Sequence, residues 1–458
     1  MRTILDSMSS SRISIVIGTI VSLASGGWLL AQSPMGNLSD VENTNRGARI
    51  GQPAAPTVVS PQPPVVLPRT FLVAPARYAE MRQTLQNPTA PWQKIARDSL
   101  RQLAISEMTK GPWSVMDKND NQIAPSGNKH DFVSYSEYFW QNAKGEWEWR
   151  DGQVNKAVIT KDIDGLYKMW TAVRILGTAG YLLDEPRFSE RAALLLRHWF
   201  LDPASYMTPH LQYAAILVPG KDEGRGVGLH RMKELPRVLD AVALLETTPY
   251  WTKEDREGFR AWLRAYVKWG TESKLGLEER TAVNNHGVYY VAHMLASALY
   301  LGDKPLATDL IENDYKKHLL SQIEPDGALP AEYKRTRPLH YTVYTLQGFG
   351  FLAELARNSG TDLYDVKGPQ GQTLHQAFEA LTPYLKGEKQ WPAKEVKLTL
   401  DEALPALRLG ALRCDNAFLE TYLQSAYPDW AKDYQNILWP PAVSLDSGRA
   451  APAPSGQH

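Results

Sequence analysis

The chain has 458 residues, with 50 Lys and Arg, 50 Asp and Glu, 10 His and one Cys. The net charge of zero argues against a nucleic-acid-binding protein, which normally carries a basic excess, and the single Cys414 excludes an internal disulfide or a cysteine-based zinc site. Aromatic residues make up 10% of the chain, which suits either stacking on sugar rings or the core of a large helical protein.

The N-terminus has the pattern of an export signal. Arg2 and Arg12 supply positive charge, and Ile13–Leu30 is a run of apolar and small residues with a candidate cleavage point after Ala31. We expect residues 1–31 to be a signal peptide. An uncleaved signal anchor is the alternative, because the run is close to the shortest length that spans a membrane. Either form predicts a protein outside the cytoplasm, periplasmic or secreted.

Two flanking segments lack the pattern of regular structure. Residues 32–68 are polar and then proline-rich, and residues 446–458 are rich in Ala and Pro. Proline has no backbone N–H and does not continue a helix or a central strand. We therefore expect a disordered linker before the folded part and a disordered tail after it.

Apolar residues recur at helical spacing through most of the remaining chain, and convincing strand alternation is scarce. The predicted helices cover residues 166–183, 191–201, 235–245, 254–269, 288–301, 306–323, 340–356, 374–385 and 417–426.

Two short segments share a helix–turn–helix form. Tyr181–Pro186 (YLLDEP) and Tyr300–Pro305 (YLGDKP) each end one helix, turn, and begin the next helix with Pro in its first turn. This form also occurs in many all-α proteins, but its recurrence favours antiparallel helical hairpins. The predicted fold class is all-α, an (α/α) toroid or incomplete barrel built of such hairpins.

An irregular stretch rich in polar and aromatic residues covers residues 126–155. Its basic and aromatic side chains suit a loop that lines a sugar cleft. The alternative is a surface loop held by its own aromatic side chains. The residues predicted to bind substrate here are Lys129, His130, Tyr135, Tyr138 and Trp140.

A second segment, Asn284-Asn285-His286-Gly287, precedes an apolar helix. Asn is a preferred helix N-cap, which is a sufficient structural explanation. However, free backbone N–H groups, amide donors and an imidazole at a helix N-terminus also make an anion site. We predict that Asn284, Asn285 and His286 contribute to such a site.

A third segment, residues 332–344, combines basic residues with tyrosines. If a helix begins near Pro338, then Arg337 stands at its start, and Tyr341 and Tyr344 follow four and seven residues later on one helical stripe. A guanidinium beside a tyrosine stabilises the phenolate and lowers the pKa, as a tyrosine base requires. The alternative is a solvated basic run followed by core tyrosines.

These residue types together suit β-elimination at a uronic acid. That reaction removes the weakly acidic proton next to a carboxylate, so the site must neutralise the carboxylate while an enolate builds up. It also needs a base and a proton donor for the leaving oxygen, roles that Tyr and His can fill. The scheme requires no metal or cofactor, and the sequence carries no HExxH, EF-hand or Cys–His metal motif.

At these segments the chain resembles the alginate lyase-like polysaccharide lyases, which have an (α/α) toroid fold. The resemblance runs in order over roughly residues 120–385, in the blocks GNKHDFVSYSEYFW, RDGQVN, YAAILVPGKDEGRGVGL, NNHG, QIEPDGALPAEYKRTRPLHY and LTPYL. It implies an exported enzyme that cleaves an acidic polysaccharide such as alginate or glucuronan by β-elimination.

The resemblance also implies roles for single residues. Asn285 and Arg337 would neutralise the carboxylate, His286 would neutralise charge or act as base, and Tyr344 would be acid, base or both. Tyr341 is a rival for the role of Tyr344. Lys129 and His130 fall on the loop that closes over the sugar, and Arg225 falls in a further shared block, so the resemblance implies substrate contacts for them.

The chain departs from the family pattern near two of these blocks. After the NNHG motif, relatives often carry Thr, Trp, Asp and Gln where this chain has Val288, Tyr289, Val291 and His293, and Ala215 stands where Gln is common. Several of these changes remove polar groups that could line a subsite. The proposed catalytic residues remain, so a weak or differently specific lyase is an alternative.

The predicted organisation has five parts: a signal in residues 1–31, a linker in residues 32–68, the catalytic toroid in residues 69–390, C-terminal helices in residues 391–445 and a tail in residues 446–458. We expect a monomer that binds an acidic polysaccharide, binds no nucleic acid and contacts no membrane beyond a possible N-terminal anchor.

Two other functions compete with the lyase. One is a non-catalytic carbohydrate-binding envelope protein. The other is a glycoside hydrolase on a similar toroid, which needs two carboxylates placed across a sugar bond. The spacing of the available carboxylates does not pair them; these are Asp131, Asp164, Asp326 and Glu332.

Overall fold

The structure is a computed structural model that describes residues 67–393 and 398–441. The described residues belong to one compact unit. The predicted signal segment, all but the end of the predicted linker and the predicted tail lie outside them. Within the described residues, no helix has both the length and the apolar composition that a membrane span needs.

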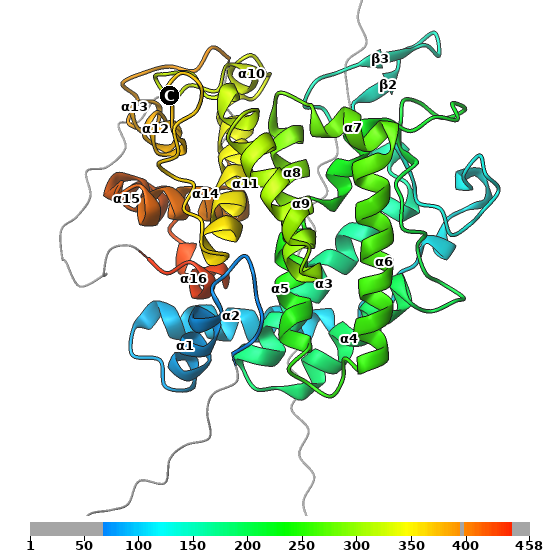
Figure 1. The fold of residues 1–458 in the computed structure, drawn as a ribbon, viewed down its shortest axis with the longest axis horizontal. Helices are drawn as coiled ribbons and strands as arrows, with labels where there is room; N and C mark the ends of the chain where they lie inside the picture. Colours follow the sequence, from blue (N-terminus) through cyan, green and yellow to red (C-terminus); the bar gives the residue numbers. More distant parts are fainter. Residues whose placement is uncertain (1–66, 394–397, 442–458) are drawn as a thin grey trace, which may run out of the picture. The chain divides into compact units, whose positions relative to one another are not determined.

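Helices dominate the described chain (Figure 1). The α-helices are α1 (Pro75–Gln86), α2 (Pro91–Glu107), α3 (Lys161–Leu182), α4 (Pro186–Phe200), α5 (Leu235–Leu245), α6 (Lys253–Glu272), α7 (Lys274–Arg280), α8 (Asn285–Leu301), α9 (Lys304–Asp309), α10 (Pro330–Tyr333), α11 (Pro338–Asn358), α12 (Leu374–Glu379), α13 (Thr382–Leu385), α14 (Leu400–Arg413), α15 (Ala417–Ala426) and α16 (Gln435–Leu438).

The long helices pack in a continuous series. Helix α3 contacts α2, α4 and α5; α5 contacts α8, α8 contacts α11, and α11 contacts α14. Figure 1 shows α5, α8 and α11 side by side. This series of helical hairpins is the (α/α) toroid that the sequence predicts, and the described helices do not close into a barrel.

The two YLxDxP segments form the predicted turns between helices. Helix α3 ends at Leu182 and α4 begins at Pro186, while α8 ends at Leu301 and α9 begins at Lys304. The left-handed residue differs, however: it is Asp184 (φ 56°) in the first turn and Gly302 (φ 77°) in the second. These positions are offset by one in the shared pattern, so the turns are related but not identical.

Some helix predictions were wrong, and the physical reasons differ. Residues 306–323 do not form one helix, because α9 passes into a π-helical turn (Leu310–Tyr315) and then a 3₁₀ turn (Leu319–Gln322). Residues 374–385 divide into α12 and α13, where Pro383 starts a new helix. Helices α1 and α2 were not predicted. The buried stripe of α2 is narrow and contains only one large apolar residue: Ala96, Leu100, Ala104 and Glu107.

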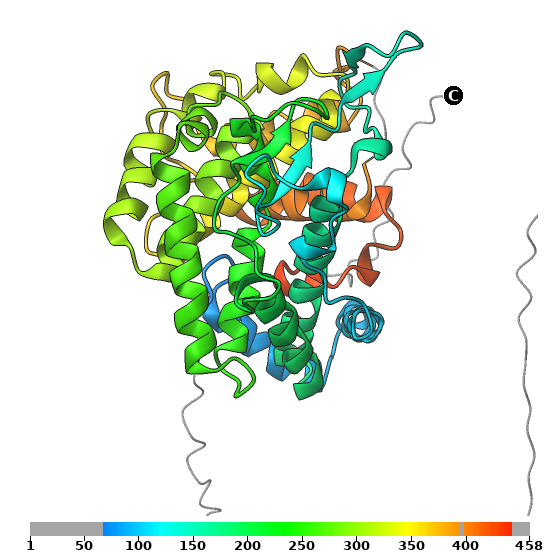
Figure 2. The same ribbon diagram turned by 90° about the vertical axis from the view of Figure 1, so that its right-hand side faces the viewer.

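Four short strands accompany the helices: β1 (Val133–Tyr135), β2 (Phe139–Gln141), β3 (Trp147–Trp149) and β4 (Tyr213–Ile216). β1 pairs with β4 in parallel, and β2 pairs with β3 as an antiparallel hairpin. Three short segments of the predicted irregular loop are therefore strands. The β2–β3 hairpin projects from one end of the helical body (Figures 1 and 2).

The first described residues are fixed to α5 by one buried carboxylate. Asp240, which is 1% exposed, accepts backbone N–H bonds from Phe71 (2.6 Å), Leu72 (3.0 Å) and Val73 (2.8 Å). Helix α1 follows these residues, so Asp240 positions the start of the fold.

We expect Asp240→Asn to lower the free energy of unfolding by about 1–3 kcal/mol, because the new amide nitrogen leaves a buried N–H without an acceptor. Urea denaturation measures this change. Asp98→Asn, at an exposed carboxylate, should change stability by less than about 0.5 kcal/mol. Equal effects of the two substitutions would contradict the anchoring role.

The helix core contains a fully buried imidazole, that of His293. It bonds to the Tyr266 hydroxyl at 3.0 Å and to the Tyr289 carbonyl at 2.8 Å, and burial lowers its pKa to about 3. An unfolded histidine titrates near pH 6.5. Between these values the unfolded chain binds the additional proton, so this stabilisation is present above about pH 6.5 and is lost as the pH falls.

We expect the free energy of unfolding of the wild type to fall by up to about 1.4 kcal/mol per pH unit below pH 6.5 from this group. In His293→Gln that part of the slope disappears. Urea denaturation at several pH values measures it, with His198→Gln, at a partly exposed histidine, as control. An unchanged slope in His293→Gln would rule out this histidine as a source of acid sensitivity.

Candidate active site

A cleft of about 880 Å³ opens where four elements meet: the 3₁₀ turn η4 (Gly226–Met232), the start of α8, the start of α11 and the β2–β3 hairpin. It continues toward α2 and the C-terminal residues 429–435. Side chains that line it include Tyr138, Trp149, Arg225, His230, Lys233, Asn285, His286, Arg335, Tyr341 and Tyr344.

Tyr344 is hydrogen-bonded to a histidine that the sequence analysis did not single out. Its hydroxyl lies 2.6 Å from Nε2 of His230, and the centroids of the two rings are 5.7 Å apart. Burial lowers the pKa of His230 well below its usual value, so this imidazole is neutral. Burial also raises the pKa of Tyr344 well above its usual value. The phenol is therefore protonated and donates to His230.

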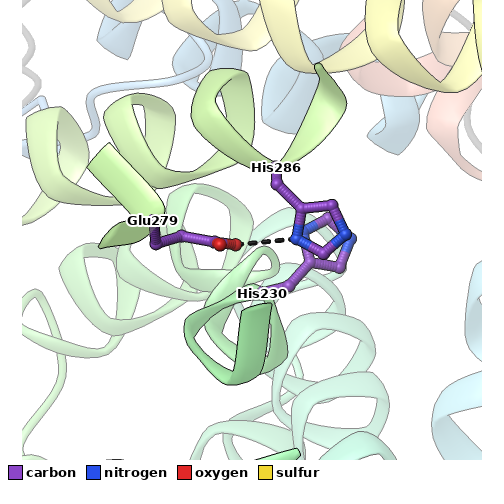
Figure 3. A group of neighbouring side chains, drawn as sticks. All are labelled: His230, Glu279 and His286. Carbon is purple, nitrogen blue, oxygen red and sulfur yellow. Dashed lines mark hydrogen bonds and ion pairs between the residues drawn. The ribbon is translucent and has the colours of Figure 1, made fainter. Parts of the chain in front are cut away.

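His286 is paired with a buried carboxylate. Its Nδ1 lies 2.8 Å from Oε1 of Glu279, which is 1% exposed and comes from α7 (Figure 3). A carboxylate that accepts the Nδ1–H bond leaves Nε2 as the basic nitrogen of a neutral imidazole. The His230 ring lies beside that of His286, with 4.6 Å between the ring centroids.

The expected anion site at the start of α8 is filled by the protein itself. The backbone N–H and side-chain amide of Asn285 both donate to the buried carboxylate of Glu332, at 2.8 and 3.1 Å. The side chain of Asn284 is the N-cap and accepts the backbone N–H of His286 at 3.0 Å. Asn285 lines the cleft, but the amide nitrogen that was expected to meet a substrate carboxylate already bonds to Glu332.

Tyr341 belongs to a second group at the rim of the cleft. Its hydroxyl lies 3.2 Å from that of Tyr138, which connects α11 to the β2–β3 hairpin. The guanidinium of Arg335 lies 3.6 Å from the centroid of the Tyr341 ring and forms an ion pair with Asp151. Burial, followed by the bond to Tyr138, raises the pKa of Tyr341, and this outweighs the opposing charge of Arg335.

The expectation that an arginine lowers the pKa of these tyrosines was therefore wrong, because burial outweighs the neighbouring charge. The arginine over the tyrosine is also Arg335, not Arg337. Arg337 is the N-cap of α11, with φ −137° and ψ 70°, and this non-helical backbone takes it out of the helical register. Its Nε is buried without a hydrogen bond in the described part of the chain.

The residues of the predicted sugar-binding loop separate into two groups. Tyr138 lines the cleft. Of the others, His130 stacks on Tyr206 and bonds to its carbonyl, Tyr135 packs in a small apolar cluster, and Trp140 bonds to the carbonyl of Gln153. Within residues 67–393 and 398–441, Lys129, His130, Tyr135 and Trp140 are not part of the cleft lining.

Arg225 lines the cleft and supports its wall. Its guanidinium donates to the Ala215 carbonyl at 3.0 Å and to the Ser136 hydroxyl at 2.9 Å. The flanking glycines allow this segment to lie against β4: a Cβ on Gly228 would lie 2.6 Å from that of Ala214. The Arg225 guanidinium is therefore fixed in position by its hydrogen bonds to the cleft wall.

Several residues at the cleft were not predicted, because they lie just outside the motifs: His230 follows the GRGVG segment, and Glu279 precedes the NNHG segment. No local sequence motif marks His230 or Glu279 as a site residue. The packing of the helices brings both side chains to His286. Lys233, directly after η4, lies with its ammonium 4.8 Å from the centroid of the Tyr344 ring. A histidine or lysine shortly after the GRGVG segment was the available signal for His230 and Lys233.

The carboxylates considered for a hydrolase have other partners. Asp131 bonds to Ser126 and Thr208, Asp164 bonds to Lys168, and Glu332 bonds to Asn285. None of the four, Asp326 included, is among the described residues that line the cleft. These four carboxylates therefore do not provide in the cleft the pair that glycoside hydrolysis needs.

Comparison with known proteins identifies the class to which this toroid and its cleft belong. The family model "Alginate lyase" matches residues 114–391, and the chain belongs to this family.

Solved structures show the same fold. An alginate lyase from Bacteroides ovatus is 30% identical, with a TM-score of 0.74, and the alignment covers 83% of this chain and 100% of that one. A ligand-free variant of alginate lyase A1-III, an enzyme of Sphingomonas species A1, is 15% identical with a TM-score of 0.51, over 77% of this chain and 88% of that one. No match was found among curated proteins. The chain is a polysaccharide lyase that acts on an acidic polysaccharide.

Proposed function

We propose that this lyase cleaves alginate, with His286 as the base and Tyr344 as the acid. The observation that carries the proposal is the placement of both side chains around His230, with the Nδ1 of His286 held by Glu279 and the phenol of Tyr344 protonated. The family and the Bacteroides ovatus structure support alginate as the polymer.

The elimination follows from these protonation states. Nε2 of His286 takes the proton from the carbon next to the carboxylate, and that electron pair forms the new carbon–carbon double bond. The bond to the leaving glycosidic oxygen breaks, and Tyr344 gives its proton to that oxygen. Return of the proton from His286 to Tyr344 completes the cycle, and His230 stands between the two residues.

The common location of base and acid predicts a preference among uronic acids. In mannuronate and glucuronate, the proton next to the carboxylate and the leaving oxygen are on the same face of the ring, whereas in guluronate they are on opposite faces. His286 and Tyr344 both flank His230, so they approach the sugar from one side. This arrangement favours mannuronate blocks of alginate over guluronate blocks.

Two ammonium groups line the cleft, those of Lys233 and Lys432, and Lys432 is paired with Asp429. Arg335 is paired with Asp151, Arg231 with Glu137, and Arg237 with Glu234. Among the described residues, no carboxylate oxygen lies within 4.0 Å of the Lys233 ammonium, so Lys233 forms no ion pair there. The ammonium lies beside the ring of Tyr344, the proposed acid. Lys233 is therefore the cation that we assign to the uronate carboxylate.

We expect Lys233→Met to lower kcat/KM for the polymer about ten- to hundredfold, the loss of a charged hydrogen bond of about 1.5–3 kcal/mol. Lys233→Arg, which keeps the charge, should retain most of the activity. Initial rates of double-bond formation measure both. A Lys233→Met enzyme with wild-type kcat/KM would move carboxylate binding to another residue.

The function itself is tested with separate polymers. Polymannuronate, polyguluronate and glucuronan are incubated with the protein, and absorbance of the conjugated double bond is followed. We expect the highest kcat/KM on polymannuronate. Absence of unsaturated product from every polyuronate would overturn the lyase activity, while a preference for polyguluronate would overturn the one-sided geometry.

We also propose export from the cytoplasm, which the charged and apolar pattern of residues 1–31 supports. Fractionation of cells that express the full chain tests it, and recovery of the enzyme only in the cytoplasm would overturn it.

A further inference from the structure

A compact set of three ligand-type side chains lies at the wall of the cleft: His230 and His286 line it, and Glu279 lies behind His286. His230 comes from η4, Glu279 from α7 and His286 from α8 (Figure 3). One nitrogen or oxygen atom of each residue lies within 4.8 Å of the others. Because three separate elements converge here, the cluster depends on the tertiary fold and not on a local motif.

The chemistry of the set matches a borderline-soft divalent ion. Two imidazoles and one carboxylate are the protein ligands of many zinc sites that keep one position open. Glu279 is 1% exposed and contributes negative charge, while Nδ1 of His230 is buried without a hydrogen-bond partner in the described residues. An unsatisfied buried nitrogen beside a second imidazole and a carboxylate is the environment that an ion can complete.

We propose that His230, Glu279 and His286 bind a zinc-type divalent ion, and that this ion inhibits the enzyme. When the ion binds Nδ1 of His286, the proton that this nitrogen shares with Glu279 moves to Nε2, so the neutral imidazole keeps its one proton. A tetrahedral ion about 2.0–2.2 Å from each ligand atom holds these atoms about 3.3–3.6 Å apart, which requires shifts of about one ångström.

The ion inhibits the enzyme because it blocks proton transfer by His286 and Tyr344. The imidazole of His286 can no longer accept a proton, and the cation lies beside the Tyr344 hydroxyl, which bonds to His230. This consequence rests on the proposed function, whereas binding of the ion does not. The ion is an inhibitor here and not a cofactor, so the reaction scheme remains free of metal.

The binding test is calorimetric titration of the full, tag-free chain with ZnCl₂, and with MgCl₂ and CaCl₂ for comparison. We expect one Zn²⁺ per chain, weaker binding at low pH because protonated imidazoles do not bind the ion, and no heat from Mg²⁺ or Ca²⁺, which prefer oxygen ligands. Glu279→Gln should weaken Zn²⁺ binding at least about tenfold, and His230→Ala should do the same.

The matched control is His375→Gln. His375 is a surface histidine with Asp365 at 3.3 Å and Glu379 at 3.5 Å, but these carboxylates flank different ring nitrogens and so cannot share one ion. Zn²⁺ binding should be unchanged in this variant. Loss of binding in His375→Gln with retention in Glu279→Gln would overturn the proposed site. Circular dichroism verifies that each variant folds. If His230→Ala does not fold, the nearly isosteric Glu279→Gln still tests the site.

Activity is measured separately. We expect added Zn²⁺ to reduce the rate of double-bond formation and a chelator to restore it. If the protein binds Zn²⁺ through Glu279 but cleaves no polyuronate, the proposed metal site stands and the proposed function is refuted. An active enzyme that binds no Zn²⁺ at this cluster would refute the metal site alone.

Discussion

Tyr344→Phe is expected to lower kcat on polymannuronate by about 10²–10⁴, the usual contribution of a positioned proton donor. Phe keeps the ring, which packs against Tyr289 with 4.6 Å between centroids, and removes only the hydroxyl that bonds to His230. Because the pKa of Tyr344 is raised, the lost group is a protonated phenol. The leaving oxygen then departs without a proton, so kcat falls while KM changes little.

Two further tyrosines separate this role from general structural effects. Tyr290→Phe, on α8, removes a buried hydroxyl that bonds to the Gly270 carbonyl, and we expect lower stability with nearly unchanged kcat. Tyr341→Phe tests the rival proton donor. If Tyr341→Phe, and not Tyr344→Phe, abolished turnover, the acid would lie at the rim beside Tyr138. Substrate depletion and double-bond absorbance measure all three variants.

His286→Ala is expected to lower kcat by a similar factor of about 10²–10⁴, because the only proposed base is removed. Added imidazole should restore part of the rate, since it can occupy the space left by the side chain. His198→Ala, on α4, should leave the rate unchanged. A His286→Ala enzyme that keeps more than about a tenth of wild-type kcat would contradict the assignment of the base.

Glu279→Gln tests how His286 is oriented. Glu279 lies behind the imidazole and is not among the described residues that line the cleft, so it acts through His286. We expect kcat to fall about ten- to hundredfold, the range for loss of a charged hydrogen bond of about 1.5–3 kcal/mol, while KM is unchanged. Glu279→Asp, which keeps the charge, should recover part of the rate.

The sequence allowed the class of fold to be predicted, because helical periodicity is a local property. Helices α5 and α15 have the predicted bounds, and α11 begins at Pro338 as expected. The π-helical turn after α9 was not predicted, since tertiary contacts of Leu310 and Tyr315 in the core set that backbone. Periodicity alone does not report such a change.

The site residues that could be predicted are those that belong to the sequence motifs shared with the family. His286, Tyr341 and Tyr344 came from such segments and line the cleft. Their catalytic roles remain predictions. Lys129, His130 and Trp140 were selected by residue type in a polar loop, and residue type does not say which face of a loop meets the cleft.

The sequence by itself determined that the chain is a helical toroid of the alginate lyase family, and it placed an Asn-His pair at the start of one helix. Only the tertiary structure decided which groups meet. His230 and Tyr344 are 114 residues apart, and Asn285 and Glu332 are 47 apart. Such contacts depend on how helices pack. Burial in that packing, not neighbouring charge along the chain, keeps Tyr341 and Tyr344 protonated.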